Sequence, residues 1–230
     1  MDRGVDMLRH VAQTHLPSGV YRYQQLKRRT AVFLDAGIVF IHVPKNAGTS
    51  ISLAVYGRFV GHVRSSDVDR WGNAQLKALP RFSVVRNPWD RCYSAYRFAI
   101  ADRSGDAGRG LEKISRPERY NRPEFATFSR FLHEWLVMRD LSAVDQVFRP
   151  QVVFLKNRNG QMNLEFTGRV EQMDAVAAYL TEKLGRPIVI GRKNATARPG
   201  HDYRAHYSPE DRDLVGRIYS EDVEAFNYDF

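Results

Sequence analysis

The sequence predicts an α/β protein in which parallel strands run into short loops and then into helices. Two observations predict this class. Residues 37–57 and residues 81–100 each have the pattern of an apolar strand, a polar turn and a helix, and continuous apolar runs of this kind are typical of buried parallel strands. At 230 residues the chain is long enough for one full core and too short for two sizeable domains. We therefore predict a single domain over residues 1–230.

Composition excludes several classes of protein. A hydrophobic fraction of 43% and an aromatic fraction of 12% are those of a globular protein, and no run is apolar enough to predict a membrane span. The first ten residues mix acids and bases without an apolar core, so we expect neither a secretory signal nor a location outside the cytoplasm. Cys92 is the single cysteine, which excludes an internal disulfide and a cysteine-based metal cluster.

The charge balance favours anionic partners. Lysine and arginine number 35 against 26 aspartates and glutamates, a net charge of +9. Such a field attracts nucleotides, nucleic acids and acidic glycans alike. The arginines are scattered and no nucleic-acid-binding motif is present, so a dedicated nucleic-acid module is the weaker interpretation.

The first strand–loop–helix unit is centred on residues 37–52. We expect a strand at Thr30–Leu34 and a turn ending at Gly37 to form a hairpin with the apolar run Ile38–Val43, after which Pro44 and Gly48 break the pattern. The helix that follows runs to about Gly57. Its first N–H groups lack partners and carry the positive end of the helix dipole, and Lys45, Thr49 and Ser50 add one charge and two hydroxyl groups. This loop is predicted to bind a phosphate.

The loop differs from the common nucleotide-binding pattern GxxxxGK[ST], because Lys45 precedes Gly48 by three residues instead of following it. Taken alone, the loop is also compatible with an ordinary strand-to-helix turn that carries a surface lysine.

The second unit repeats this design. Phe82–Val85 has the pattern of a strand, Asn87 is a suitable N-cap, and Pro88 fits the first position of a helix that continues to Ile100. Arg86 then lies at the carboxyl end of a strand, where open α/β sheets bind ligands. We expect Arg91 and Arg97 to lie on a solvated helix face.

The rest of the chain supplies further elements. Residues 101–123 are rich in glycine, arginine and proline and predict a long mobile loop or lid, and residues 1–30 are interpreted as an N-terminal extension. Other predicted elements are helices at Thr127–Met138, Glu171–Leu184 and two after Ser208, and strands near Val152–Leu155, Leu164–Val170 and Val189.

Four segments together resemble one family of enzymes. They are VPKNAGTS (43–50), RNPWDRCYSAYRF (86–98), GRVEQMDAVAAYL (168–180) and EDVEAFNY (221–228). As a set they resemble the carbohydrate sulfotransferases, most closely the branch that includes heparan sulfate 2-O-sulfotransferase and its bacterial relatives. The resemblance covers most of residues 37–230, apart from the 101–123 loop.

This resemblance implies a P-loop-like parallel sheet flanked by helices and the donor 3′-phosphoadenosine 5′-phosphosulfate (PAPS), with adenosine 3′,5′-bisphosphate as product and no metal. It implies that Lys45 stabilises the leaving phosphate and that His62, in a Gly-His-Val segment, is the base that activates an acceptor hydroxyl. The acceptor would be a carbohydrate or a glycosylated molecule. The implied nucleotide-binding residues are Lys45, Asn46, Ala47, Gly48, Thr49, Ser50, Arg86, Ser94, Arg169, Lys193 and Asn194. Animal members are anchored in Golgi membranes, whereas we expect no membrane anchor in this sequence.

Two alternatives remain at this point. A nucleotide-dependent kinase would use similar phosphate loops, although the GK[ST] order and an evident magnesium-binding aspartate at a strand end are missing. A basic module that binds nucleotides or polyanions without catalysis would use the same residues.

Overall fold

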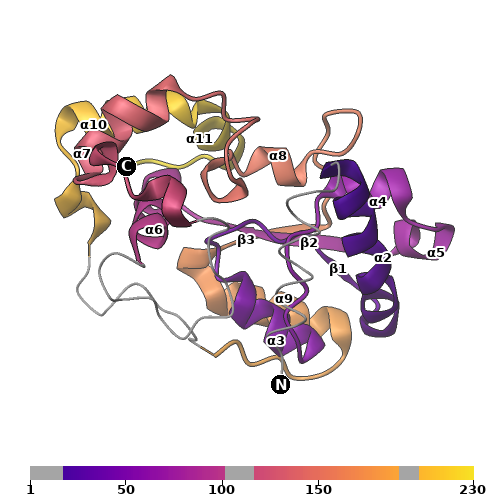
Figure 1. Cartoon of the computed structure of the whole chain (residues 1–230). Coiled ribbons are helices and arrows are strands. Elements are labelled where there is room, and N and C mark those ends of the chain that lie inside the picture. The colour runs from indigo at the N-terminus through magenta and orange to yellow at the C-terminus, as the bar shows by residue number, and fades with distance from the viewer. Residues whose placement is uncertain (1–17, 102–116, 192–201) are drawn as a thin grey trace, which may run out of the picture.

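The computed structural model describes residues 18–101, 117–191 and 202–230. At its centre lies a parallel sheet of three strands in the order β1-β2-β3 (Figure 1), formed by β1 (Val39–Phe40), β2 (Arg81–Val85) and β3 (Phe166–Arg169). Phe82 of β2 pairs with Phe40 on one side and with Phe166 on the other, and Val85 pairs with Arg169. The three strands therefore end at one common edge of the sheet.

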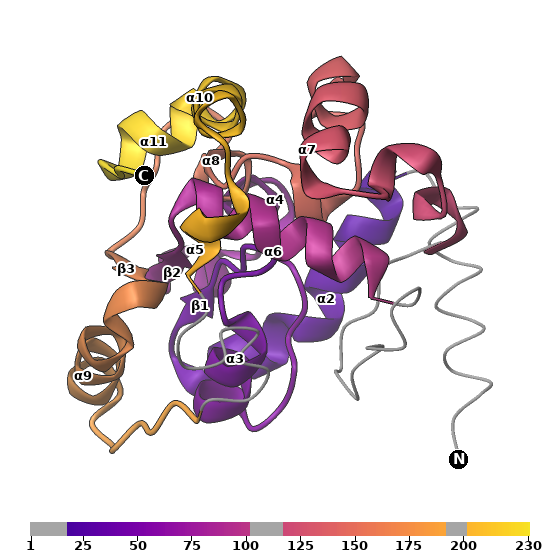
Figure 2. The same cartoon turned by 90° about the vertical axis from the view of Figure 1, so that its left-hand side faces the viewer.

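Helices surround this sheet and account for most of the described chain, which agrees with the predicted α/β class. In Figure 1, α3 and α9 lie below the strands, while α8 and α11 lie above them. The view turned by 90° shows α9 beside β3 and α6 across the middle of the molecule (Figure 2). The α-helices are α2 (Ser18–Ala36), α3 (Gly48–Tyr56), α4 (Ser65–Trp71), α5 (Ala74–Ala78), α6 (Pro88–Ile100), α7 (Phe128–Arg130), α8 (Val152–Leu155), α9 (Met173–Leu184), α10 (Pro209–Ile218) and α11 (Ser220–Phe226).

Several predicted helices are confirmed together with their end signals. Helix α3 ends before Gly57, and α9 ends before Gly185, and both glycines adopt the left-handed conformation that closes helices. Helix α10 begins at Pro209 behind Ser208, whose hydroxyl and whose backbone N–H form a capping box with Asp211. The predicted helix at Thr127–Met138 is confirmed as α7 followed by a π-helical turn (Phe131–Trp135) and a 3-10 turn (Leu136–Met138).

Three predicted strands are wrong. The predicted hairpin strand Thr30–Leu34 lies inside α2, a helix of 19 residues whose Leu26 and Phe33 are buried one heptad apart. The segment Val152–Leu155 is helix α8, although its residues favour strands. Val189 is 83% exposed and lies outside any strand. In the first two cases a short apolar run was compatible with either kind of element, and tertiary packing decided between them.

The predicted extension and lid are partly described. Residues 18–30 belong to α2, and Leu26 contributes to the core. Residues 102–116 of the predicted lid lie outside the described part of the chain. Beyond them, two 3-10 turns (Pro117–Tyr120 and Pro123–Phe125) place Tyr120 and Phe125 in an aromatic cluster with Phe131, Trp135 and Phe148. Within the predicted loop, Tyr120 therefore belongs to the core, while residues 118, 119 and 121–123 are exposed. In the described residues, no helix is long and apolar enough to cross a membrane.

Candidate functional site

The candidate site lies at the carboxyl edge of the sheet, where both strand–turn–helix units arrive. Residues 41–47 connect β1 to α3, and residues 86–87 connect β2 to α6. Because β1 and β2 are parallel neighbours, these two turns lie side by side. The structure therefore brings together the two segments in which the sequence predicted phosphate-binding residues.

The first turn, residues 44–48, is called the phosphate loop below. Lys45 and Ala47 have φ angles of 72° and 58°, a left-handed conformation that costs free energy in residues other than glycine and that gathers at functional sites. Ala47 is the N-cap of α3, and its methyl group cannot accept a hydrogen bond from the helix. The first bond of α3 runs from Ile51 N–H to Ala47 O at 3.2 Å, so three amides precede it at the N-terminus. Such a helix start favours an anion.

Gly48 is required by close packing against His42. A Cβ atom at residue 48 would lie 1.7 Å from Nε2 of His42, so no side chain fits there without movement of the imidazole. His42 is 1% exposed and donates from Nδ1 to Gly61 O at 2.9 Å. The buried imidazole therefore packs directly against Gly48, the first residue of α3.

Side chains of the second unit fix the shape of the phosphate loop. Arg86 donates to Lys45 O at 3.1 Å, and Arg91 donates to Pro44 O at 3.1 Å. Asn46 is 1% exposed and donates from Nδ2 to Val84 O at 2.9 Å, so its side chain points into the protein and only its backbone faces the loop.

Arg91 was predicted to be solvated, and this prediction is wrong. Its side chain is 2% exposed, and it also donates to Val147 O at 3.3 Å. Burial lowers the pKa of Arg91, and the carboxylate of Asp222 opposes that shift. Helix α6 is buried on most of its surface, so its sequence pattern did not mark an exposed face for this arginine. Arg97, by contrast, is exposed as predicted.

Arg86 is held in place by its own helix. Its Nε and Nη2 atoms each donate to Asp90 at 2.7 Å, a bidentate pair one helical turn apart. The Arg86 side chain is 11% exposed, and its guanidinium group bridges Asp90 and the phosphate loop. Arg86 therefore presents a fixed positive charge beside the loop.

Ser94 lies on the same stripe of α6. Residues 90, 94 and 98 follow one another at intervals of four, and such residues share one helix face. At one end of this stripe, Asp90 binds the guanidinium group of Arg86, which also donates to Lys45 O. At the other end, the Lys45 ammonium lies 4.1 Å from the ring centroid of Phe98. The Ser94 hydroxyl group is buried and has no hydrogen-bond partner within the described residues. Buried polar groups usually have a partner, so this hydroxyl is a candidate contact for a ligand.

His62 lies against His42, which comes two residues after the end of β1. Its ring centroid is 4.2 Å from that of His42, and its Nδ1 lies 3.3 Å from His42 O. A carbonyl oxygen only accepts hydrogen bonds, so Nδ1 carries the proton and the lone pair resides on Nε2. His62 is half-buried. This tautomer is the one that a general base acting through Nε2 requires.

The comparison with protein families bears directly on this arrangement. A family model described as "Sulfotransferase family" matches residues 28–229, which is most of the chain. The chain belongs to the sulfotransferase family. Comparisons with curated proteins and with solved structures gave no match. Family membership makes the protein a transferase of sulfuryl groups, and it assigns no particular branch within the family.

The remaining residues predicted for this sulfotransferase's site have other neighbours. Arg169 ends β3 beside Val85, but it donates to Phe226 O at 2.6 Å and stacks over Tyr228, so its described contacts hold the C-terminal tail against the sheet edge. Lys193 and Asn194 lie outside the described residues.

Sequence reasoning missed three residues that organise the site. Glu171 accepts hydrogen bonds from Asn87 N–H at 2.8 Å and from the Tyr228 hydroxyl at 2.9 Å, which ties the second turn to the tail. Gln151 bonds to both turns, at sequence separations of 105 and 65 residues. Asp222 accepts hydrogen bonds from the backbone N–H groups of Gln151 and Val152, about 70 residues away. No local pattern marks such long-range partners.

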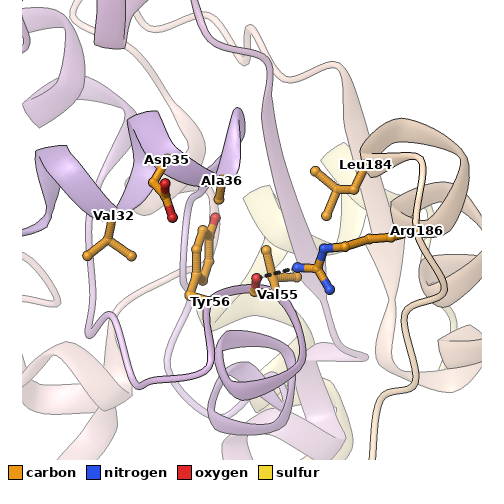
Figure 3. A pocket seen from close by; sticks show the side chains of 7 residues that line it. All are labelled: Val32, Asp35, Ala36, Val55, Tyr56, Leu184 and Arg186. Carbon is orange, nitrogen blue, oxygen red and sulfur yellow. Dashed lines mark hydrogen bonds between the residues drawn. The ribbon is translucent and has the colours of Figure 1, made fainter.

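Two cavities of the described chain lie away from this site. One is lined by Val32, Asp35, Ala36, Val55, Tyr56, Leu184 and Arg186, at the end where α3 and α9 finish (Figure 3). There Arg186 donates to Val55 O at 2.7 Å and Tyr56 donates to Ile38 O at 3.0 Å, so the polar groups serve the fold. A second cavity lies beside Arg81 and Glu165, at the amino ends of β2 and β3. Ligand sites of open α/β sheets lie at the opposite edge, so we place the site by its chemistry. Among the described residues, no three acidic, histidine or cysteine side chains converge on a metal site.

Proposed function

We propose that this sulfotransferase uses PAPS as donor and transfers its sulfuryl group to a hydroxyl of a carbohydrate or glycosylated acceptor. The observation that carries the proposal is the position of Lys45. Its backbone belongs to the phosphate loop, its carbonyl accepts from Arg86, and its ammonium lies over Phe98 of α6. The backbone of Lys45 is thus bonded to the second turn through Arg86, and its ammonium is held against α6, the helix that follows that turn.

The residues fit a nucleotide with phosphates at both ends of its ribose. The phosphate loop offers backbone amides, the Lys45 ammonium and the hydroxyl groups of Thr49 and Ser50 for the 5′-phosphosulfate. The second unit offers the Arg86 guanidinium and the orphan hydroxyl of Ser94 for the 3′-phosphate. The resemblance of residues 43–50 and 86–98 to carbohydrate sulfotransferases supports the same division.

The proposed chemistry requires two kinds of group from the protein, a positive charge at the leaving phosphate and a base at the acceptor. The acceptor oxygen forms a bond to sulfur while the bond from sulfur to the 5′-phosphate oxygen breaks, and adenosine 3′,5′-bisphosphate leaves with that electron pair. Lys45 and the N-terminus of α3 stabilise the charge on the leaving phosphate. The acceptor proton passes to Nε2 of His62, whose Nδ1–H bond to His42 O keeps the ring oriented.

The test is a transfer assay with sulfur-labelled PAPS and a panel of glycans and small hydroxylated metabolites, run with a metal chelator present. We expect labelled product and release of adenosine 3′,5′-bisphosphate, because protein cations supply the charge that a metal would otherwise supply. ATP with magnesium, in parallel reactions without chelator, serves as the comparison donor. Transfer from ATP without transfer from PAPS would contradict the proposal. If PAPS binds tightly but is not turned over with any acceptor, the result would favour a binding module.

A further inference from the structure

One buried amide connects the two phosphate-binding turns. Gln151, at the N-cap of α8, is 0% exposed, and its side chain reaches the space between residue 46 of the loop and residue 86 of the second turn. Neither the family resemblance nor the proposed chemistry uses this residue.

The amide group of Gln151 is used from both ends. Its Oε1 accepts from Arg86 N–H at 3.0 Å and from Asn46 Nδ2 at 2.7 Å, and its Nε2 donates to Arg86 O at 2.9 Å. Both backbone groups of Arg86 are therefore bonded to the same side chain. Both polar atoms of the Gln151 side chain are thus bonded, whereas Oδ1 of Asn46 has no hydrogen-bond partner among the described residues. Buried hydrogen bonds of this kind fix geometry as well as stability.

The position of Gln151 is itself fixed from the C-terminal region. Asp222 is 0% exposed and accepts from Gln151 N–H at 2.8 Å and from Val152 N–H at 2.9 Å. Its carboxylate caps the start of α8, a role that Gln151 does not play for its own helix. Asp222 thus anchors the backbone from which the Gln151 side chain extends toward the site.

We propose that Gln151 is a positioning residue that sets the distance between the phosphate loop and the Arg86 turn, so that one nucleotide contacts both with its two phosphates. This inference rests on the proposed function, in which the loop binds the 5′-phosphate and Arg86 the 3′-phosphate. Each turn can bind its own phosphate without Gln151. What Gln151 adds is the simultaneous fit, since two linked binding groups gain affinity only when the spacing of their sites matches.

The test compares three ligands on the full chain by calorimetry, namely adenosine 3′,5′-bisphosphate, adenosine 5′-monophosphate and adenosine 3′-monophosphate. Gln151→Met keeps the length of the side chain and removes all of its side-chain hydrogen bonds. Gln151→Glu keeps its size and provides a second variant if the methionine protein does not fold. Ser83→Ala is the matched control, because Ser83 is 0% exposed and donates to Ile41 O at 2.6 Å, which links the same two strands below the turns.

We expect wild-type protein and the Ser83 control to bind the bisphosphate more tightly than either monophosphate. In the Gln151 variants this advantage should shrink by about tenfold or more, while each monophosphate keeps its affinity within about twofold, because small misplacements of paired groups carry large penalties. A loss shared equally by all three ligands would mean general destabilisation, and an unchanged advantage would mean that Gln151 does not set the spacing. Both results would overturn this inference alone. An absence of any bisphosphate advantage in the wild type would overturn the proposed function as well.

Discussion

The two strand–turn–helix units share one edge of the sheet but end in different chemistry. The first unit starts its helix at Ala47, which has no polar side chain to cap it. The second starts at Asn87, whose Oδ1 accepts from Trp89 N–H at 3.0 Å and whose own N–H donates to Glu171 at 2.8 Å. The protein therefore satisfies the second helix start with its own groups.

This difference indicates a division of labour. The first unit offers backbone amides at a helix N-terminus, and the strained residues Lys45 and Ala47 shape them. The second unit offers side chains, the Arg86 guanidinium and the Ser94 hydroxyl, from a helix that is already capped. Under the proposed function, similar sequence patterns thus supply one phosphate site from backbone groups and one from side chains.

The largest expected effect concerns the base beside the first unit. His62→Ala should lower turnover by roughly 10²–10⁴-fold, the usual effect of losing a general base, and leave donor binding nearly unchanged. Steady-state rates, with donor affinity measured separately, check both points. Normal turnover in His62→Ala would assign the base to another residue.

Gly48→Ala tests whether phosphate binding by the first unit depends on the close packing of Gly48 against His42. The new Cβ atom would overlap His42 Nε2, so α3 or the imidazole must move, at a cost of about 1–3 kcal/mol for overpacking. We expect lower stability and binding of adenosine 5′-monophosphate weakened by about tenfold or more, measured by thermal unfolding and calorimetry. Gly19→Ala is the control, since no atom lies within 4 Å of its added Cβ. Unaltered 5′-phosphate binding would place that phosphate away from α3.

Ser94→Ala separates binding from stability in the second unit. The hydroxyl is buried without a partner in the described chain, so its removal should leave the unfolding free energy unchanged or slightly higher. Nucleotides with a 3′-phosphate should lose about 1.5–3 kcal/mol of binding free energy, the range for a hydrogen bond to a charged group. Nucleotides without that phosphate provide the internal control. Equal weakening of both kinds would show that Ser94 does not contact the 3′-phosphate.

The smallest effect on binding is expected at the cap of the second helix. Asn87→Ala should cost about 1 kcal/mol of stability through loss of the cap, or a few degrees in melting temperature, and leave nucleotide affinity unchanged. Thr127→Ala removes a comparable cap from α7, distant in the chain from both turns. Strongly reduced nucleotide binding in Asn87→Ala alone would mean that the second helix start also contacts the ligand.

Local signals explain how much of the fold the sequence predicts. Both units are punctuated by residues with fixed backbone preferences, namely Pro44 and Gly48 in one and Asn87 and Pro88 in the other, so their turns and helix starts were predicted correctly. The helix at Val152–Leu155 was missed, because its first amides bond to Asp222, about 70 residues away. Gln151 was missed for the same reason, since the three hydrogen bonds of its side chain go to Asn46 and Arg86, which are 105 and 65 residues away.

The division of labour between the two units is tested most directly by phosphorus NMR of bound adenosine 3′,5′-bisphosphate, whose two phosphates give separate resonances. We expect both resonances to move on binding to the wild type. In Lys45→Ala the bound 5′ resonance should return toward its free position while the 3′ resonance keeps its shift, and Ser94→Ala should produce the opposite pattern. If both variants change the two resonances equally, or with the assignments exchanged, the proposed assignment of the loop to the 5′-phosphate and of α6 to the 3′-phosphate is wrong.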